Sequence, residues 1–433
     1  MIGFIGLSHL GINYALATAS KGFEVVGFHP SEDSVAAFKN GGFTIQEPGL
    51  QELFNSCGGR IFFTADAADL RECELVFVAL DVLTDDQNNS QMEPLSALID
   101  SVAPHLQVGV TLVLLSQVSP GFSRNLRKNL AASSNVGQVV YQVETLIFGR
   151  AVERALYPER YIVGVADPSQ PLPPSLQLWH QSFGCPVLVM NYESAELAKI
   201  AINFFLVSSV TTTNTLAEVC ENIGADWSEI VPALRLDSRI GPKAYLTPGL
   251  GIAGGNLERD LRTVQALAAQ HDIQVDLVSS WQKNSQDRRD WVLRKLRVSL
   301  PLDNPSVRVA VWGLSYKENT HSVKNSPSLA LLSATEEVSK RAFDPAVKSL
   351  PFSFANLELV DTALDACDGA DALLVMTPWS QFANIDPVAI AQRMRGGLIL
   401  DPFSILPADQ CLAAGLSHHT LGRSPRLPVR HHV

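Results

Sequence analysis

The residues Ile2-Gly3-Phe4-Ile5-Gly6-Leu7-Ser8-His9-Leu10-Gly11 combine a short apolar strand with a glycine turn that leads into a helical pattern. A strand, a glycine turn and a helix in this order are the setting in which a Gly-x-Gly-x-x-Gly pattern binds a dinucleotide. The helix N-terminus offers free N–H groups and a positive dipole to a phosphate. Here Ser8 replaces the middle glycine, so its Cβ and hydroxyl narrow the approach of a pyrophosphate. We expect Gly6, Ser8, His9, Leu10 and Gly11 to form a cofactor-binding turn.

The next apolar strand, 24–28, is followed by His29, where a dinucleotide-binding domain usually has a carboxylate for the ribose hydroxyls. A histidine cannot accept two ribose hydroxyl bonds as a carboxylate does, although its protonated form suits the 2′-phosphate of NADP. Two alternatives follow. Either the domain binds NAD or NADP through an altered turn, or it keeps a dinucleotide-binding fold and binds no dinucleotide.

Apolar strands alternate with helical stretches on both sides of a long helical middle. We expect strands at 1–5, 24–28, 75–80, 110–115, 139–143, 307–312, 373–376 and 398–400, and helices at about 12–21 and 194–223, with more helices up to 298. This layout predicts an α/β fold, in which two Rossmann-like, doubly wound parallel-sheet domains are joined by a central helical region with one long helix. The expected bounds are 1–192, 193–300 and 301–433, with a linker at 301–305 and a loosely ordered tail from about Gly422.

Length and composition describe a globular protein of two or three domains. The chain has 433 residues, of which 46% are hydrophobic and 18% charged, and its net charge is −11. This acidic balance argues against nucleic acid as the main partner. Six scattered cysteines without a CxxC pair indicate a reduced, cytoplasmic protein. We find no apolar run that is long enough to span a bilayer and no cluster with metal-ligand spacing, so we expect neither a membrane partner nor a metal.

A glycine-rich loop lies near the middle of the chain, where residues 248–260 are Pro-Gly-Leu-Gly-Ile-Ala-Gly-Gly-Asn-Leu-Glu-Arg-Asp. Four glycines in seven positions make a loop whose backbone can approach a ligand closely. Beyond the glycines come a polar side chain (Asn256), a cation (Arg259) and a carboxylate (Asp260). This combination predicts a binding or catalytic loop.

In order and spacing, the motifs of the chain resemble those of the UDP-glucose/GDP-mannose dehydrogenase family. The matching stretches are 47–50 (EPGL), 84–85 (TD), 116–121 (SQVSPG), 194–199 (SAELAK) with Asn203, 237–243 (DSRIGPK), 248–260, 313–320 (GLSYKENT), 326–327 (SP), 343–345 (FDP) and 377–379 (TPW). The resemblance extends to about Leu406. It implies an NAD-binding domain, a central region that forms a homodimer, and a C-terminal domain that binds a UDP-sugar or related NDP-sugar. It also implies a reaction in which two NAD molecules oxidise the C6 alcohol of the sugar to the uronic acid.

The resemblance implies catalytic roles for a small set of polar residues. Lys199 matches a lysine that stabilises a developing oxyanion, and Glu144 matches a general base after an apolar strand. Asn203 and Asp260 match groups that orient a water or a hydroxyl. Asn256 stands where the family has its nucleophilic cysteine, and an amide cannot form the thiol adduct from which the second hydride is lost.

Further residues follow from the same resemblance. The implied substrate-binding set is Leu146, Arg239, Tyr245, Gly251, Lys317 and Lys324, and the cofactor set gains His29 and Ser116. Lys317 is expected to face a substrate phosphate after the second glycine turn. Lys324 replaces an arginine, which keeps the charge but loses the bidentate fork. Two catalytic positions of the family are altered as well, since Gln117 replaces a threonine and Phe148 a glutamate.

Three functions remain open at this point. The first is a complete NAD-dependent nucleotide-sugar 6-dehydrogenase, which Asn256 opposes. The second is an altered oxidoreductase that stops at the aldehyde or runs a single reversible hydride transfer at another carbon. The retained Glu144, Lys199, Asn203 and Asp260 favour it. The third is a non-catalytic NDP-sugar-binding dimer, which Ser8, His29 and Phe148 favour.

Overall fold

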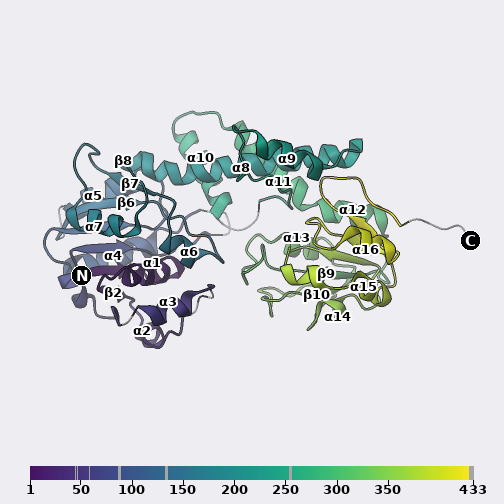
Figure 1. The fold of residues 1–433 in the computed structure, drawn as a ribbon, viewed down its shortest axis with the longest axis horizontal. Coiled ribbons are helices and arrows are strands. Elements are labelled where there is room, and N and C mark those ends of the chain that lie inside the picture. Colours follow the sequence, from purple (N-terminus) through teal and green to yellow (C-terminus); the bar gives the residue numbers. More distant parts are fainter. Residues whose placement is uncertain are drawn as a thin grey trace, which may run out of the picture. The chain divides into compact units, whose positions relative to one another are not determined.

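The computed structural model describes residues 1–43, 45, 47–57, 59–85, 89–131, 135–252 and 256–428. The chain divides into two compact units, Met1–Ile202 and Asn203–Val433. The boundary between them falls within the long helix α8 (Tyr192–Ile223), which is labelled in Figure 1. The three-part division with bounds at 192 and 300 stays a prediction.

The first unit is built on an eight-stranded sheet with the strand order β3-β2-β1-β4-β5-β6-β7-β8. Its strands are β1 (Ile2–Ile5), β2 (Val25–Phe28), β3 (Ile61–Thr64), β4 (Leu75–Val78), β5 (Val110–Leu114), β6 (Val136–Gln142), β7 (Tyr161–Val165) and β8 (Val187–Asn191). Neighbouring strands pair in parallel, except that β6 and β7 run antiparallel. The order reverses between β1 and β4, which is the point where open α/β sheets place their ligands.

Helices connect these strands. They are α1 (His9–Ser20), α2 (Glu32–Lys39), α3 (Leu50–Ser56), η1 (Ala67–Glu72), α4 (Glu93–Val102), η2 (Ala103–His105), α5 (Phe122–Ala131), α6 (Ala151–Leu156) and α7 (Pro174–Phe183). Residues 10–19 of α1 are all buried, because this helix packs against the sheet and against α3 and α6. The helix that begins at the glycine turn is therefore a central part of the core.

The second unit contains a six-stranded, wholly parallel sheet with the order β11-β10-β9-β12-β13-β14. Its strands are β9 (Arg308–Trp312), β10 (Ser339–Phe343), β11 (Leu357–Leu359), β12 (Ala372–Val375), β13 (Leu398–Leu400) and β14 (Ser417–His419). Its helices after α8 are α9 (Trp227–Leu236), α10 (Asn256–Gln270), α11 (Asp276–Arg289), α12 (Trp291–Ser299), α13 (Pro327–Ser333), α14 (Ala363–Ala366), η3 (Ser380–Asn384), α15 (Pro387–Arg393) and α16 (Ala408–Ala413). Counted from its own first strand, the sheet runs 3-2-1-4-5-6, as do the first six strands of the other unit.

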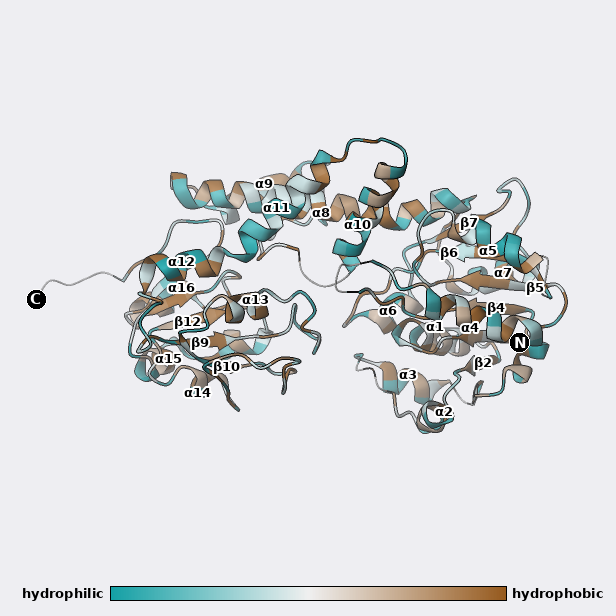
Figure 2. Cartoon of the chain, turned by 180° about the vertical axis from the view of Figure 1, so that it is seen from behind, coloured by the Kyte–Doolittle hydropathy of each residue, from teal (hydrophilic) through white to brown (hydrophobic). Residues whose placement is uncertain are grey.

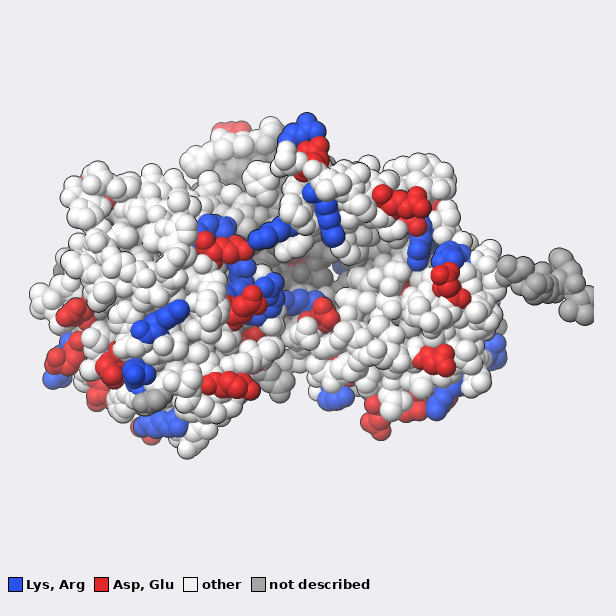
Figure 3. Space-filling view, in the orientation of Figure 1, with Lys and Arg blue, Asp and Glu red and all other residues white. Residues whose placement is uncertain are grey.

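Both sheets are covered by apolar side chains on both faces. In β4, Leu75 and Phe77 join one core cluster while Val76 and Val78 join another, and β9 divides its residues between two clusters in the same way. Figure 2 shows the resulting brown, hydrophobic colour along the strands of each sheet. Such continuous apolar strands are what a parallel sheet between two layers of helices requires. On the outer surface, Figure 3 shows cationic and anionic side chains interspersed on the visible face of each unit.

The sequence prediction of an α/β fold with two parallel sheets and one long helix is confirmed. Six strands were missed. Five of them, β3, β8, β10, β11 and β14, contain residues that are not fully buried, and β7 is buried throughout. Helix α1 begins at His9 instead of Ile12, because the glycine turn itself contributes the first helical turn.

The predicted loose order of the tail is wrong for residues 422–428, while 429–433 lie outside the described residues. The Gly422 carbonyl accepts a hydrogen bond from the Trp227 N–H at 2.8 Å, and Arg426 pairs with His418 through two backbone bonds. The tail of the second unit is thus held by main-chain contacts.

Helix α8 corrects the expectation about membrane-spanning segments. Among the described residues it is the helix that is long and apolar enough to cross a membrane. Length and composition are weak evidence, because core helices pass the same test. The second half of α8 also carries buried polar residues with partners, since Thr213 donates to the Tyr245 carbonyl and Asn214 accepts from the Gly249 N–H. The absence of a membrane partner and the cytoplasmic localisation stay predictions.

Candidate functional site

The first glycine turn keeps the two glycines that packing requires. Gly6 has φ +81°, and a Cβ there would lie 2.8 Å from the Leu80 backbone nitrogen. A Cβ on Gly11 would collide with the Gly6 carbonyl oxygen. Both positions therefore exclude a side chain whether or not a ligand binds. The backbone cradle expected for a dinucleotide is present, so the main chain of the turn fits NAD.

Ser8, at the replaced glycine, ties the turn to the loop after β4. Its hydroxyl donates to the Ala79 carbonyl at 3.2 Å and accepts from the Asp81 N–H at 2.9 Å. The Asp81 carboxylate in turn accepts from the Leu10 N–H at 3.2 Å. An internal anion thus lies at the N-terminus of α1, where a dinucleotide would place its pyrophosphate.

His9 is held by contacts from two other segments. Its Nε2 lies 2.7 Å from Glu47 Oε1, and its ring stacks on Phe148 with 4.2 Å between ring centroids. The Glu47 side chain is completely buried and also accepts from the Gly149 and Ala151 N–H groups. One carboxylate therefore connects the glycine turn with the loop that carries Phe148.

The two remaining residues of the predicted cofactor set are less suited to a ligand. Burial lowers the pKa of His29, and its Nδ1 accepts from the Ser31 N–H at 3.1 Å. A neutral imidazole is a poor partner for a 2′-phosphate, so this position does not favour NADP. Ser116 is completely buried and donates to the Leu80 carbonyl at 2.7 Å, so its hydroxyl serves the junction between β4 and β5.

Among the predicted catalytic residues, the structure brings Glu144 and Lys199 together in the first unit. Lys199 Nζ lies 2.8 Å from Glu144 Oε1 and also donates to the Glu144 carbonyl at 3.1 Å. The second carboxylate oxygen accepts from the Leu146 N–H at 2.9 Å. Both side chains are largely but not fully buried, at 14% and 17% exposure. A cation and a carboxylate at hydrogen-bond distance suit proton transfer at a sugar hydroxyl. The side chain of Leu146 itself is partly buried against the core.

In the second unit, Asn203 and Asp260 form the other pair. Asn203 Nδ2 donates to Asp260 Oδ2 at 2.5 Å, and Arg259 Nε lies 3.7 Å from Asp260 Oδ1. Asp260 is almost fully buried, so this carboxylate is held by partners inside the protein. Asn256 is the first residue of α10 and is exposed. Of the glycine-rich loop, Ala253–Gly255 lie outside the described residues.

The predicted substrate-binding residues of the second unit are spread over several elements. The Arg239 side chain is 87% exposed and pairs with Asp237 at 2.6 Å, and Tyr245 is 47% exposed. Gly251 has φ +78°, and a Cβ there would meet Ser285 of α11, so this glycine is required by packing. Lys317 and Lys324 are half-buried. Their proposed phosphate contacts stay predictions.

Three buried carboxylates position these segments and were missed by sequence reasoning. Glu47 is described above. Glu196 in α8 accepts from the Gly121 and Ser123 N–H groups at the start of α5, which joins two of the quoted motifs. Asp344 accepts from the Leu314 and Ser315 N–H groups of the second glycine turn. Each lies within or beside a motif, but the partners named here are 29 to 104 residues away, and no local pattern shows these contacts.

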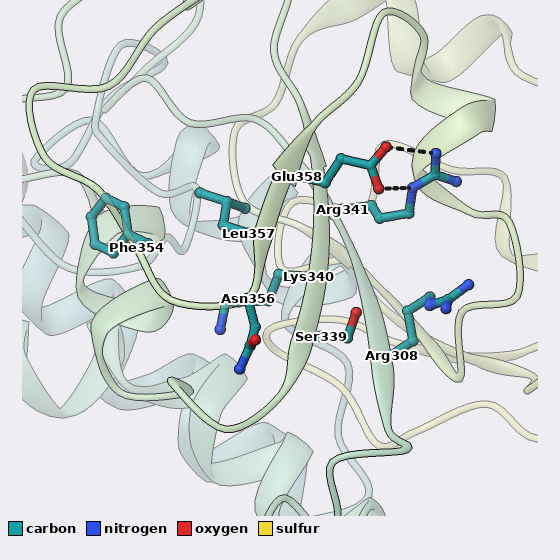
Figure 4. Close-up of a pocket in the computed structure, with 8 residues that line it drawn as sticks. All are labelled: Arg308, Ser339, Lys340, Arg341, Phe354, Asn356, Leu357 and Glu358. Carbon is teal, nitrogen blue, oxygen red and sulfur yellow. Dashed lines mark hydrogen bonds and ion pairs between the residues drawn. The ribbon is translucent and has the colours of Figure 1, made fainter.

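A separate pocket of about 370 Å³ lies on the second unit at the amino ends of β9, β10 and β11, as Figure 4 shows. Arg341 and Glu358 form a bidentate pair at its rim, with N–O distances of 2.9 and 3.2 Å. Ligands of parallel sheets bind at the carboxyl ends of strands, so we assign no ligand to this pocket.

The strand order 3-2-1-4-5-6, which both sheets contain, and a dinucleotide-type glycine turn are typical of the nucleotide-binding α/β class of proteins. Three family models match the chain. They describe the NAD binding domain of the UDP-glucose/GDP-mannose dehydrogenase family at 1–177, the central domain at 193–286 and the UDP binding domain at 310–408. The chain belongs to the UDP-glucose/GDP-mannose dehydrogenase family.

Individual relatives agree with this assignment. The chain is 27% identical over 436 residues to a UDP-glucose 6-dehydrogenase of Rhizobium meliloti, covering 98% of this chain and 99% of the relative. It is 26% identical over 430 residues to a UDP-glucose 6-dehydrogenase of Rickettsia bellii, covering 97% and 99%. Among solved structures, a UDP-glucose dehydrogenase from Pyrobaculum islandicum has the same fold, with a TM-score of 0.82 at 23% identity over 93% of this chain and 94% of that one.

Proposed function

We propose that this chain binds a UDP-sugar and NAD and transfers one hydride between them, without the thiol-dependent oxidation to the uronic acid. The observation that supports this most is the raised pKa of every cysteine thiol. Burial raises the pKa of all six cysteines, namely Cys57, Cys73, Cys185, Cys220, Cys367 and Cys411. A cysteine nucleophile needs a lowered pKa, so no thiol of this chain is prepared to add to an aldehyde.

The first oxidation needs no thiol. The sugar carbon loses a hydride while its hydroxyl loses a proton, and bound NAD supplies the hydride acceptor. Glu144 is suited to take the proton, and the ammonium of Lys199 to stabilise the alkoxide that develops. The second oxidation requires a covalent adduct of the aldehyde, and the amide of Asn256 is not a nucleophile. The reaction then ends at the carbonyl product.

The test is the stoichiometry of NADH and sugar. Purified protein is incubated with NAD and UDP-glucose or other UDP-hexoses, NADH is followed at 340 nm, and the sugar product is identified by mass spectrometry. We expect one NADH per sugar and no uronic acid. Lys199→Met should abolish NADH formation while UDP-sugar binding by calorimetry is kept. Two NADH per sugar with uronic acid as the product would refute the proposal.

Restoring the thiol is a sharper test. We expect Asn256→Cys alone to form no uronic acid, because Gln117 and Phe148 also differ from the family pattern. The matched control is Asn256→Ser, which has a similar size and no thiol. Uronic acid from the cysteine variant would show that one substitution alone limits the reaction.

A non-catalytic, NDP-sugar-binding protein is the second candidate. The observation that favours it is that polar groups of the first glycine turn already have partners within the protein. The Leu10 N–H donates to Asp81, and His9 contacts Glu47. Calorimetry separates the candidates. If UDP-glucose binds and neither NAD nor NADP does at millimolar concentration, the protein is a sugar-nucleotide-binding module and the redox proposal fails.

We further propose that the active form is a homodimer built on α8. In the second unit this helix exposes Phe205, Leu216, Val219 and Ile223, with Phe205 at 78% exposure. Their spacing places these apolar side chains on one face of the helix, as a helix–helix interface requires. Phe205→Glu should shift the sedimentation coefficient toward the monomer, whereas Asn222→Glu, at an exposed polar position of α8, should not.

A further inference from the structure

The carboxylate of Asp81 lies at the N-terminal end of α1 and is fixed there from two directions. Its Oδ2 accepts from the Leu10 N–H at 3.2 Å, and its own N–H donates to Ser8 Oγ at 2.9 Å. Ser8 Oγ donates onward to the Ala79 carbonyl at the end of β4. The loop after β4 therefore holds an anion against the first turn of the helix.

The bond formed by Asp81 uses a donor that helix geometry leaves free. The first intrahelical bond of α1 runs from the Ile12 N–H to the Ser8 carbonyl, so the Leu10 N–H has no partner within the helix. Such free N–H groups and the positive end of the helix dipole are what bind a phosphate. A dinucleotide diphosphate and the Asp81 carboxylate therefore require the same N–H group, and they repel each other.

We propose that Asp81 is an internal competitor for the diphosphate and lowers the affinity of the first unit for NAD and NADH. Asp81 is exposed, so solvent screens its charge and the side chain can rotate away when a dinucleotide enters. The effect is an attenuation of binding and not a block. The inference rests on the proposed function only in assuming that the first unit is where NAD binds.

The experiment uses Asp81→Asn in the full-length chain. Asparagine keeps an oxygen that can accept the Leu10 N–H and removes the negative charge, so it separates repulsion from hydrogen bonding. The matched control is Asp100→Asn, which removes the same charge from an exposed position on α4 of the same unit. Binding of NADH and of ADP-ribose is measured by calorimetry without sugar, at 50 mM and at 500 mM salt. Thermal melting confirms that each variant is folded.

We expect Asp81→Asn to bind both ligands about two- to five-fold more tightly at low salt, the range typical of one charge at a helix N-terminus. The gain should shrink at high salt, because screening weakens the repulsion. Asp100→Asn should bind as the unchanged chain does. No gain in Asp81→Asn, or an equal gain in the control, would overturn the inference.

The two proposals fail in different ways. If Asp81→Asn binds NADH more tightly and no variant forms NADH from a UDP-hexose, the inference stands and the redox function fails. If NADH is formed and Asp81→Asn binds it no more tightly, the inference fails and the function stands. If no form of the protein binds a dinucleotide at millimolar concentration, both fail.

Discussion

The two glycine turns of this molecule both begin with Gly-Leu-Ser, but a different kind of carboxylate binds the N–H groups of each. Gly6-Leu7-Ser8 follows β1, and Gly313-Leu314-Ser315 follows β9, the corresponding strand of the other sheet. Both glycines have positive φ, +81° and +96°, and a Cβ on either would collide with the residue two positions beyond the neighbouring strand, Leu80 or Thr377. The same backbone is thus used twice for the close packing of strand, turn and helix.

The difference lies after the second strand of each sheet, where the first unit has Phe28-His29-Pro30 and the second has Phe343-Asp344-Pro345. Asp344 is buried and accepts from the Leu314 and Ser315 N–H groups at 2.7 and 3.1 Å. His29 accepts from Ser31 instead. In the second turn a buried carboxylate accepts hydrogen bonds from the backbone N–H groups of the turn. In the first turn the carboxylate is the exposed Asp81, which a ligand can displace.

The largest effect should come from removing Asp344. Asp344→Ala would leave the N–H groups of Leu314, Ser315, Ala346, Val347 and Trp379 without this acceptor. We expect a loss of about 3–5 kcal/mol in the free energy of unfolding, since loss of one partner leaves buried polar groups unpaired. The paired substitution His29→Ala should cost less than about 1 kcal/mol. Urea denaturation of both variants checks this, and equal losses would remove the contrast between the turns.

A feature that the two units share, a histidine with a lowered pKa, can be tested with pH. Burial lowers the pKa of His180 in the first unit and of His419 in the second, to about 4 in each case. Because the folded state holds each imidazole neutral, the unfolded state binds more protons between about pH 6.5 and 4. The contribution of each histidine to the free energy of unfolding is therefore fully present above pH 6.5 and is lost as the pH drops toward 4. We expect each histidine to account for about 2–3 kcal/mol of that loss.

The measurement is the free energy of unfolding at several pH values. His180→Gln should reduce the acid-induced loss, because it removes the imidazole that takes up a proton. The glutamine amide can still pair with Gln142, the present partner at 2.7 Å. His105→Gln, at an exposed position of η2, is the control for removing a histidine. A pH dependence that is unchanged by His180→Gln would show that other groups cause the acid sensitivity.

Much of this architecture could be predicted from the sequence, and the reason is physical. The glycines of the first turn, the apolar strands β1, β4 and β5 and the long helix α8 are local patterns, and each was predicted within a few residues. The motifs also identified the family, whose three models match the chain. Strands such as β10 (Ser339–Phe343) were missed, because alternate residues are only partly buried and the pattern is weak.

The polar contacts of the candidate site could not be predicted in the same way. The Glu144–Lys199 pair joins residues 55 positions apart, and the Asp81–Leu10 contact joins residues 71 positions apart. Only the fold brings them together. The parallel strands β1 and β4 end at the same edge of the sheet, which places Asp81 beside Leu10. Lys199 instead reaches Glu144 from α8, which follows β8, a strand that runs opposite to β6. Sequence reasoning identified His29 as unusual. It did not show that Asp81, on another strand connection, supplies a carboxylate to the same turn.

A smaller effect on stability should come from Ser8, the residue that fixes Asp81. Ser8→Gly removes the hydroxyl between the Ala79 carbonyl and the Asp81 N–H and adds backbone freedom. We expect a cost of about 1 kcal/mol in urea denaturation. Ser8→Ala is the control that loses the hydroxyl and keeps the Cβ. If the glycine variant binds NADH more tightly than the alanine variant, the Cβ itself obstructs the diphosphate, as the sequence predicts.

The smallest effect concerns the choice between NAD and NADP at His29. Since burial lowers the pKa of His29, its imidazole is neutral at pH 7 and offers no charge to a 2′-phosphate. We therefore expect the ratio of NADPH to NADH affinity to change by less than about two-fold between pH 8 and pH 6.5 in fluorescence titrations. His29→Arg supplies a permanent charge and should shift the ratio toward NADPH at both pH values. A marked gain in NADPH affinity at pH 6.5 in the unchanged chain would mean that a bound phosphate protonates His29. In that case the negative group at this position would come from the ligand phosphate in the first unit and from the Asp344 carboxylate in the second.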